Sequence, residues 1–352
     1  MKIAQVAPLY ESVPPRYYGG TERVVSYLTE ALVKLGHDVT LYASGDSVTE
    51  ADLRPACRRS LRLDKTSTEP FADHVLLAER IFQEAEEFDV VHSHIDYLAF
   101  PLLRRMATPH VTTLHGRLDI PNLRDLFREF KDEPVISISK HQQLPLSWAN
   151  WQGTILHGLP EKLYSLREEP GRYLAFLGRI SPEKRVDRAI QIALRSGLPL
   201  KIAAKVDKPD QEYFETKIKP LLEHKDIEYI GEIGEAEKAA FLGGACALLF
   251  PIDWPEPFGL VMIEAMACGT PVIAFPHGSV PEIVEHGVTG FLVRDVNEAI
   301  NAVARLRRLS RRKCREKFEA RFTSTRMARE YVGLFEQLTH RETVHELSAD
   351  LL

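Results

Sequence analysis

The chain has 352 residues, of which 44% are hydrophobic and 27% are charged, and its formal net charge at pH 7 is -5. This length exceeds what one ordinary hydrophobic core supports, so we expect two domains. The acidic balance argues against a general nucleic-acid binder, because any phosphate ligand must be met by a few local cations and amides.

Short apolar runs alternate with amphipathic segments along the chain, which is typical of parallel sheets wound with helices. No strand is predicted in residues 50–68, which show no clear period. We expect an α/β protein with two Rossmann-like, doubly wound domains. The predicted strands are residues 3–7, 39–43, 90–93, 111–114, 135–138 and 154–156, followed by 173–177, 200–204, 227–230, 247–250, 272–274 and 291–293.

The boundary between the domains is expected near His157 and Gly158, where Gly158 and Pro160 interrupt a strand ahead of a charged stretch. The predicted domains are residues 1–157 and 158–324, followed by an amphipathic segment, 325–352. Ligands of open parallel sheets bind outside the carboxyl ends of the strands. Two such domains facing each other would form a cleft, and we expect the chemistry there.

A glycine pair, Gly19 and Gly20, follows the first strand and its loop, where a helix begins. Glycines let the backbone approach a phosphate or a sugar closely, although the pair lacks the full glycine pattern of dinucleotide binders. The preceding loop carries Arg16, Tyr17 and Tyr18, whose aromatic rings offer faces for stacking on an acceptor sugar. An ordinary mobile loop with scattered aromatic residues is the alternative.

Three histidines lie at or near predicted strand ends. His115 follows the strand 111–114, and on sequence alone a lone histidine is more often structural than catalytic. His92 and His94 share one face of a strand, but no third ligand has convincing spacing, so packing is favoured over a metal site. No Asp-x-Asp motif is present to hold a divalent ion.

Two cations follow the first strand of the second domain. Arg179 can bind phosphate oxygens through its planar guanidinium, and Lys184 can act as a point charge, so together they could offset a leaving diphosphate. The alternative is that both are surface cations beside a helix start.

The most informative segment is 254–274, which joins a turn to a helix and a buried strand. Prolines and Gly259 delay the helix, leaving first-turn amides without intrahelical partners at the positive end of its dipole. An anion fits there, while Glu256 on the loop and Glu264 inside the helix can reach hydroxyls beside it. The expected donor amides are those of Phe258, Gly259 and Leu260.

Glu256 and Glu264, with seven residues between them that include Pro257 to Leu260, resemble the signature of retaining glycosyltransferases of family 4. The resemblance implies a GT-B fold, with Glu256 beside the donor sugar and Glu264 on the nucleotide ribose. It also implies phosphate binding by Arg179 and Lys184, a glycine loop at Gly19, and His115 near the sugar ring. The loop around Ile233 is expected beside the base. Segment 325–352 is expected to cross back to the first domain.

The resulting hypothesis is that the protein transfers a hexose from a nucleoside diphosphate sugar with retention of the anomeric configuration. The resemblance to the family implies a UDP-linked donor. Glu256 and His115 are the candidate catalytic residues. The acceptor is a hydroxyl of a glycan, a lipid or a small molecule. We expect no cofactor and no metal, because Arg179, Lys184 and the helix amides would carry the charge of the leaving group. Sugar, base, acceptor, linkage and oligomeric state stay open.

Other functions are also compatible with parts of the sequence. A non-catalytic sugar-nucleotide sensor or a GT-B nucleotide-sugar epimerase could share this fold. A phosphorylase would need a pyridoxal lysine that we cannot place. A NAD oxidoreductase is disfavoured because no Gly-x-Gly-x-x-Gly turn follows either first strand.

Residues 305–321 contain many cations, which indicate either a solvated helical face or contact with anionic lipid heads. The sequence shows no signal peptide, no apolar run long enough to cross a bilayer and no paired cysteine spacing, so we expect a cytoplasmic protein. Peripheral binding at the inner membrane face is the alternative.

Overall fold

The computed structural model describes residues 1–64, 66, 69–169 and 171–349, and only the backbone of 341–349. The chain forms two compact units. Met1–Pro160 and Ser324–Leu352 make up the first, and Glu161–Thr323 makes up the second. The chain therefore leaves the first unit once and returns to it.

The first unit is built on a seven-stranded sheet with the order β3-β2-β1-β4-β5-β6-β7, in which every neighbouring pair is parallel. Its central strands are buried on both faces, which explains their nearly continuous apolar sequences. The strands are β1 (Lys2–Val6), β2 (Asp38–Ser44), β3 (Asp52–Cys57), β4 (Val90–Ser93), β5 (His110–Thr113), β6 (Val135–Ser137) and β7 (Trp151–Thr154).

Two strands of this sheet differ from the prediction. β3 lies in the segment where no strand was expected, because an edge strand needs no apolar run. Its Arg54 is half-buried and donates to Glu84 and Glu87, both at 2.7 Å. β7 starts at Trp151 and ends at Thr154, so the predicted strand 154–156 was placed too late in the chain.

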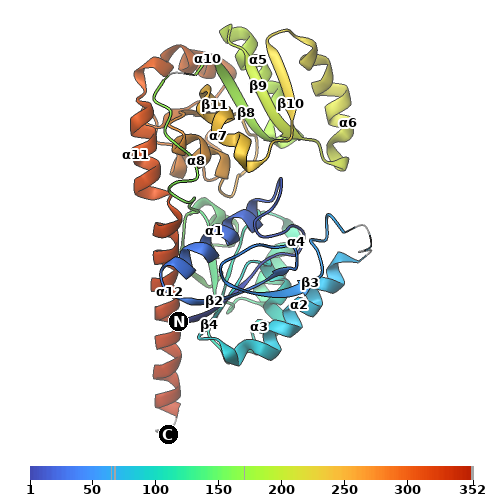
Figure 1. The fold of residues 1–352 in the computed structure, drawn as a ribbon, viewed down its shortest axis with the longest axis vertical. Helices are drawn as coiled ribbons and strands as arrows, with labels where there is room; N and C mark the ends of the chain where they lie inside the picture. Colours follow the sequence, from blue (N-terminus) through green and yellow to red (C-terminus); the bar gives the residue numbers. More distant parts are fainter. Residues whose placement is uncertain (65, 67–68, 170, 350–352) are drawn as a thin grey trace. The chain divides into compact units, whose positions relative to one another are not determined.

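Helices of the first unit follow its strands, and the long C-terminal helix α12 packs against α1 (Figure 1). The α-helices are α1 (Gly20–Lys34), α2 (Pro70–Glu84), α3 (Phe100–Leu103), α4 (Pro121–Glu129) and α12 (Ser324–Ala349). Short 3-10 turns are η1 (Ala85–Glu87), η2 (Asp96–Ala99) and η3 (His141–Leu146).

The second unit repeats this plan with a six-stranded parallel sheet, ordered β10-β9-β8-β11-β12-β13. The strands are β8 (Tyr173–Arg179), β9 (Leu200–Lys205), β10 (Ile227–Gly231), β11 (Ala245–Phe250), β12 (Val272–Ala274) and β13 (Gly290–Leu292). The α-helices are α5 (Val186–Ser196), α6 (Gln211–Tyr213), α7 (Glu235–Gly243), α8 (Leu260–Ala267), α9 (Val280–Ile283), α10 (Val296–Arg305) and α11 (Arg311–Arg321). The shorter turns are η4 (Pro182–Lys184), η5 (Lys208–Asp210), the π-helix η6 (Phe214–Ile218), η7 (Lys219–Glu223) and η8 (Leu306–Arg308).

The predicted α/β fold with two Rossmann-like, doubly wound sheets is confirmed. In each sheet the unit's first strand is central, and the strand order reverses beside it: between β1 and β4, and between β8 and β11. Carboxyl ends of strands at such a reversal are where open parallel sheets bind ligands. The loops after β1, β4, β8 and β11 are therefore the places to look for a site.

The cation-rich run at α11 is not one solvated face, which corrects the first of the two interpretations above. Arg311 is buried, and its guanidinium donates to four backbone carbonyls and one hydroxyl. Arg315 is half-buried and also donates to carbonyls, while Arg312 and Lys313 are exposed. The acceptors of Arg311 are the carbonyls of Arg167, Gly243, Ala245 and Cys268 and Oγ1 of Thr270. Arg311 and Arg315 thus hold separate segments of the second unit together.

Candidate active site

The predicted cation pair lies at the carboxyl end of β8, and each cation is already paired with acids. The guanidinium of Arg179 lies 2.5 Å from Glu183 and 3.7 Å from both Asp207 and Asp210. Burial raises the pKa of the Asp210 carboxyl, against the lowering effect of Arg179. Any anion that binds Arg179 would have to compete with these carboxylates, which the sequence did not indicate.

Glu256 lies in the loop after β11, is buried, and pairs directly with Lys184 of η4. The same carboxylate oxygen accepts from the indole Nε1 of Trp254 at 3.0 Å, and the Lys184 ammonium lies 4.6 Å from the Trp254 ring centre. Sequence reasoning placed Glu256 and Lys184 but gave no role to the Trp254 side chain. The three groups form one ion pair with an aromatic wall.

The loop that carries Glu256 is held from behind by Gly278 and Ser279. Gly278 has φ of +63°, and a Cβ there would lie 2.3 Å from the backbone N and O of Glu256, so only glycine fits. Ser279 N donates to the Glu256 carbonyl at 2.9 Å, and Ser279 Oγ donates to the Phe258 carbonyl at 2.8 Å. This support fixes the backbone from which the carboxylate projects.

Gly259 is the left-handed N-cap of α8, with φ of 81°, and Leu260 is the first helical residue. The Phe258 side chain is buried and packs edge-on against Phe322, with ring centres 6.5 Å apart. Phe258 therefore contributes its backbone to the turn, while its side chain belongs to the core. Anion binding by the amides of these residues stays a prediction.

Glu264 is buried within α8 and pairs with a lysine that sequence reasoning missed. Lys238 of α7 places its Nζ 2.8 Å from Glu264 Oε1 and 3.4 Å from Glu235 Oε2. Ile233, the residue expected beside the base, is half-buried in the loop just before α7. The available signal was a lysine one helical turn after Glu235 on the helix that follows this loop.

In the first unit, His115 lies just beyond the end of β5 and is fixed from several sides. Its Nε2 lies 2.9 Å from Nδ1 of His94, and its ring stacks on His157 with centres 5.4 Å apart. Its backbone N donates to Asp96 Oδ1 at 3.1 Å. Burial lowers the pKa of His115 to about 3 and raises that of Asp96 to about 6, so the imidazole is neutral at pH 7.

A buried glutamine holds the chain around His115. Gln142 Nε2 donates to the carbonyls of Leu114, at 2.9 Å, and Gly116, at 2.8 Å, while its Oε1 accepts from Ile138 N. The backbone on both sides of His115 is thus fixed by one amide.

The histidine pair at the end of β4, with His92 on the strand and His94 just beyond it, is hydrogen-bonded to protein groups. His92 and His94 both contact the side chain of Gln5, at 3.1 and 2.9 Å. Within the part of the chain that the structure describes, no group of three or more His, Cys, Asp or Glu side chains is arranged to hold a metal ion. The observed contacts thus tie both rings to the Gln5 amide.

The glycine loop precedes α1, and Gly19 is required there by close packing. A Cβ on Gly19 would lie 2.7 Å from Pro15 Cβ. The side chains of Arg16, Tyr17 and Tyr18 are exposed, as acceptor contacts would need to be, and Gly20 opens the helix. The Tyr17 carbonyl accepts from Arg23 of α1 at 2.6 Å, which ties this loop to the helix.

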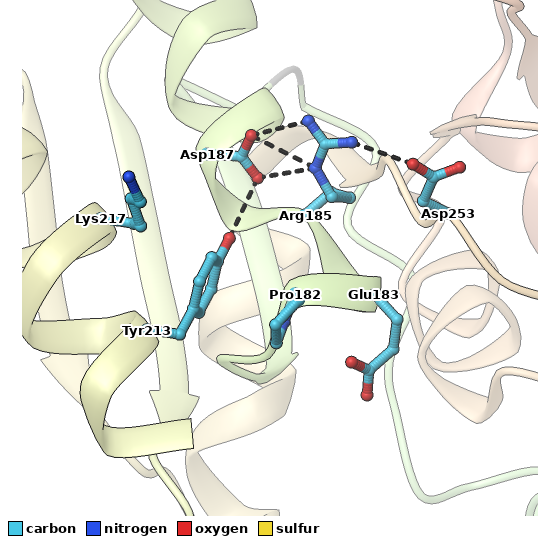
Figure 2. Close-up of a pocket in the computed structure, with 7 residues that line it drawn as sticks. All are labelled: Pro182, Glu183, Arg185, Asp187, Tyr213, Lys217 and Asp253. Carbon is cyan, nitrogen blue, oxygen red and sulfur yellow. Dashed lines mark hydrogen bonds and ion pairs between the residues drawn. The ribbon is translucent and has the colours of Figure 1, made fainter. Parts of the chain in front are cut away.

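An open cavity of about 670 Å³ lies beside η4, on the loops that follow β8, β9 and β11 (Figure 2). Three of its charged groups interact with one another: the Arg185 guanidinium donates to Asp187 at 2.8 Å and to Asp253 at 3.0 Å, and the Tyr213 hydroxyl donates to Asp187 at 3.2 Å. The lining residues are Pro182, Glu183, Arg185, Asp187, Tyr213, Lys217 and Asp253. Its wall includes Glu183, the partner of Arg179, so the cavity adjoins the cation pair.

None of the described helices combines the length and apolar character needed to cross a bilayer.

Two family models match the chain, Glycosyltransferase Family 4 over residues 18–180 and Glycosyl transferases group 1 over residues 164–324. An uncharacterized glycosyltransferase of Methanocaldococcus jannaschii is 31% identical over 61% of this chain and 63% of its own length. The N-acetyl-alpha-D-glucosaminyl L-malate synthase of Bacillus anthracis is 26% identical over 83% of this chain and 84% of its own.

Among solved structures, Anabaena HepE in complex with UDP and glucose superimposes with a TM-score of 0.74 at 19% identity, covering 96% of this chain and all of that one. At this identity the likeness concerns the fold alone. The two family matches together run from the glycine loop, through the Arg179 and Lys184 pair, to the Glu256 and Glu264 segment. The chain belongs to the glycosyltransferases of the family 4 type, with a GT-B fold.

Proposed function

We propose that this glycosyltransferase moves a hexose from a UDP-linked sugar to a hydroxyl acceptor and keeps the donor's anomeric configuration. One observation carries the proposal: two buried carboxylates, Glu256 and Glu264, lie on either side of the Gly259 cap, and each pairs with a lysine. Such an arrangement supplies cations for a diphosphate and acceptors for hydroxyls within one unit.

The proposed roles follow from where charge develops during transfer. Negative charge grows on the leaving diphosphate, so Arg179, Lys184 and the amides at Gly259 act there. When phosphate engages Lys184, the Glu256 carboxylate loses part of its pairing and becomes available to an electron-poor sugar ring. His115 is the proposed catalytic residue of the first unit.

The donor's nucleotide is proposed to lie on α7 and α8, with the ribose hydroxyls on Glu264 and the base near Ile233. Support for UDP comes from its common use as the donor nucleotide in this family and from the HepE complex with UDP and glucose. A thermal-shift screen of nucleoside diphosphates and their sugars checks it, because a ligand that binds only the native state raises its melting temperature. A larger shift with another base would replace UDP in the proposal.

Transfer is proposed to need no divalent ion, since the sequence has no Asp-x-Asp motif and the cations named above serve the leaving group. Activity should survive a chelator. Complete loss with chelator, restored by magnesium, would refute this part of the proposal.

The catalytic test is Glu256→Gln, which keeps hydrogen-bonding atoms but removes the charge. We expect kcat to fall by about 100-fold or more, with the Kd for UDP changed by less than about threefold. The matched control is Asp253→Asn in the same loop, whose carboxylate pairs with Arg185 and Arg188. Loss of UDP binding in Glu256→Gln, or equal loss of kcat in the control, would contradict the role. Nucleotide binding with no transfer to any acceptor would favour a sensor.

The acceptor is proposed to meet the exposed loop with Arg16, Tyr17 and Tyr18. Contact with anionic lipid is kept as a proposal for the exposed cations Arg307, Arg308, Arg312 and Lys313. Sedimentation with anionic and with neutral vesicles tests it, and binding that does not depend on lipid charge would exclude these cations as the cause.

A further inference from the structure

A continuous chain of polar side chains crosses the buried interior of the first unit and ends at His115. From His115 it runs to His94 at 2.9 Å, to Gln5 at 2.9 Å, and then to His92 at 3.1 Å. It continues from His92 to Thr113 at 2.7 Å and from Thr113 to the hydroxyl of Tyr331 at 2.9 Å. The contacts come from β1, β4, β5 and α12.

The groups beyond His115, which is itself only partly buried, are almost fully shielded from water. Gln5, His92 and Thr113 have no exposed surface, and His94 and Tyr331 are each only 1% exposed. The far end is covered by α12, where the rings of Tyr331 and Phe335 lie 4.7 and 5.3 Å from that of His92. Polar groups this deeply buried are retained only when they are hydrogen-bonded.

The imidazoles in this hydrogen-bonded series of side chains are neutral at pH 7. Burial lowers the pKa of His92 and of His94 well below the ordinary value, and neighbouring histidines lower both further. A neutral imidazole carries one N–H and one bare nitrogen, so each ring donates on one side and accepts on the other. The hydrogen bonds of the series can therefore all run in one direction or all in the other.

Gln5 is the only group in the chain whose two ends differ by covalent structure, since its oxygen only accepts and its nitrogen only donates. Its Oε1 faces His94 Nε2, which must then carry the proton and leave His94 Nδ1 bare. Bare His94 Nδ1 accepts from His115 Nε2, so His115 also carries its proton on Nε2.

On the other side, Gln5 Nε2 donates to His92 Nδ1, so His92 holds its proton on Nε2 and donates to Thr113. All three rings thus share one tautomer. The reversed amide would give the opposite tautomer at every ring and would turn the outer nitrogen of His115 from an acceptor into a donor.

We propose that Gln5 is a positioning residue that sets the tautomer of His115 through His94, so that His115 offers a bare Nδ1 as a hydrogen-bond acceptor. Among the described residues, none donates to His115 Nδ1. What Nδ1 binds rests on the proposed function: a sugar hydroxyl would donate to it. The tautomer itself does not depend on that function.

The direct test is nuclear magnetic resonance of the full chain with ¹⁵N-labelled histidine, in which two-bond correlations distinguish the two tautomers and the cation. At pH 7, His92, His94 and His115 should all be neutral with the proton on Nε2. Peaks are assigned by His92→Gln, His94→Gln and His115→Gln. A proton on Nδ1 of His115, or a charged ring, overturns the proposal.

Variants of Gln5 separate its role from mere packing. Gln5→Met removes both ends, so the His115 signals should move toward an average of the two tautomers. Gln5→Glu with an ionised carboxylate offers only acceptors, so His94 should still donate to it and His115 should stay protonated on Nε2. An unchanged His115 in a folded Gln5→Met also overturns the proposal. If Gln5→Met does not fold, the unaltered protein and Gln5→Glu still decide it.

The matched control is Gln142→Met, which removes another buried amide beside His115 but touches no imidazole nitrogen. Its His115 should keep the proton on Nε2. With an active donor and acceptor, Gln5→Met should lower kcat/KM about tenfold, the size of one lost hydrogen bond, and Gln5→Glu should recover most of it. Absence of any transfer would count against the proposed function and leave the spectroscopic result standing.

Discussion

The two units share one strand order, but they treat the polar groups at their switch points in opposite ways. In the first unit the groups are buried, neutral and directional, from His115 through Gln5 to Tyr331. In the second they are ion pairs, Lys184 with Glu256 and Lys238 with Glu264. Neutral rings orient hydroxyls without attracting anions, whereas displaceable ion pairs attract phosphate. If the proposed function holds, the same fold would serve two kinds of ligand chemistry in the two units.

The burial of the histidines also differs between the two units. His74, His92, His94 and His157 of the first unit are buried, whereas His224, His277 and His286 of the second are all exposed. Only the first unit should therefore lose stability steeply in mild acid.

The largest expected effect is acid unfolding of the first unit. Burial lowers the pKa of four histidines in the first unit. Below about pH 6.5 the unfolded chain therefore binds protons at these positions that the folded unit does not bind. Stability is therefore present above that pH and is lost as pH falls, at about 1.4 kcal/mol per pH unit for each ring, or on the order of 5 kcal/mol per pH unit together. The rings are His92, His94, His115 and His157.

Tryptophan fluorescence can follow each unit separately. Trp148 and Trp151 report on the first unit in a Trp254→Phe variant, and Trp254 reports on the second when both others are replaced by Phe. The urea midpoint of the first unit should fall between pH 7.5 and pH 5.5 far more than that of the second. Equal shifts in both units would remove the contrast.

The next largest effect concerns charge buried in the second unit. Arg311→Met leaves backbone carbonyls without their donor, and we expect a loss of about 3–5 kcal/mol in the free energy of unfolding. Its exposed neighbour Arg312, paired with Glu168, is the control, and Arg312→Met should change stability by less than about 0.5 kcal/mol. Comparable losses in both variants would mean that burial of Arg311 carries no special weight.

A third effect makes the first unit respond to pH in the other direction. Burial raises the pKa of Glu22, at the start of α1, from 4.5 to about 7, and the carboxylate of Glu11 adds to this. The native carboxyl holds a proton that the unfolded chain releases, so this group's contribution falls as pH rises from about 4.5 to about 7. The total is up to about 3 kcal/mol at 1.4 kcal/mol per pH unit.

Glu22→Gln removes this titration. The variant should gain stability relative to the unaltered protein between pH 5 and pH 8, measured by urea unfolding at both values. A difference that stays constant with pH would show that Glu22 titrates normally.

The sequence predicts the central strands of both sheets and both edge strands of the second sheet, but it misses β3 and misplaces β7, the edge strands of the first sheet. Central parallel strands are buried on both faces and are therefore mostly apolar, which makes them recognisable in the sequence. The edge strand β3 is half-exposed and is held by the ion pairs of Arg54, so its sequence looks irregular. The same pairing explains why it still joins the sheet.

The sequence also predicts only part of the candidate site. Glu256 and Glu264 are visible because a turn and a helix place them at fixed spacing. Their partners, Trp254 and Lys238, depend on side-chain directions that spacing does not reveal. Gln5 could have been noticed, because an amide inside a strand of apolar residues must find partners, and its register places it opposite His92.

The smallest expected effect tests whether the ion pairs of the second unit serve binding. Lys238→Met leaves the Glu264 carboxylate unbalanced beside the proposed nucleotide, so UDP affinity should fall about tenfold, or 1.4 kcal/mol. Isothermal titration of UDP measures this, with the exposed Lys217→Met as the control of equal charge change. An unchanged Kd for Lys238→Met would mean that the pair is structural. A tenfold loss restricted to Lys238→Met would show that the charge balance around Glu264 is tuned for an anion, in contrast to the neutral chain of the first unit.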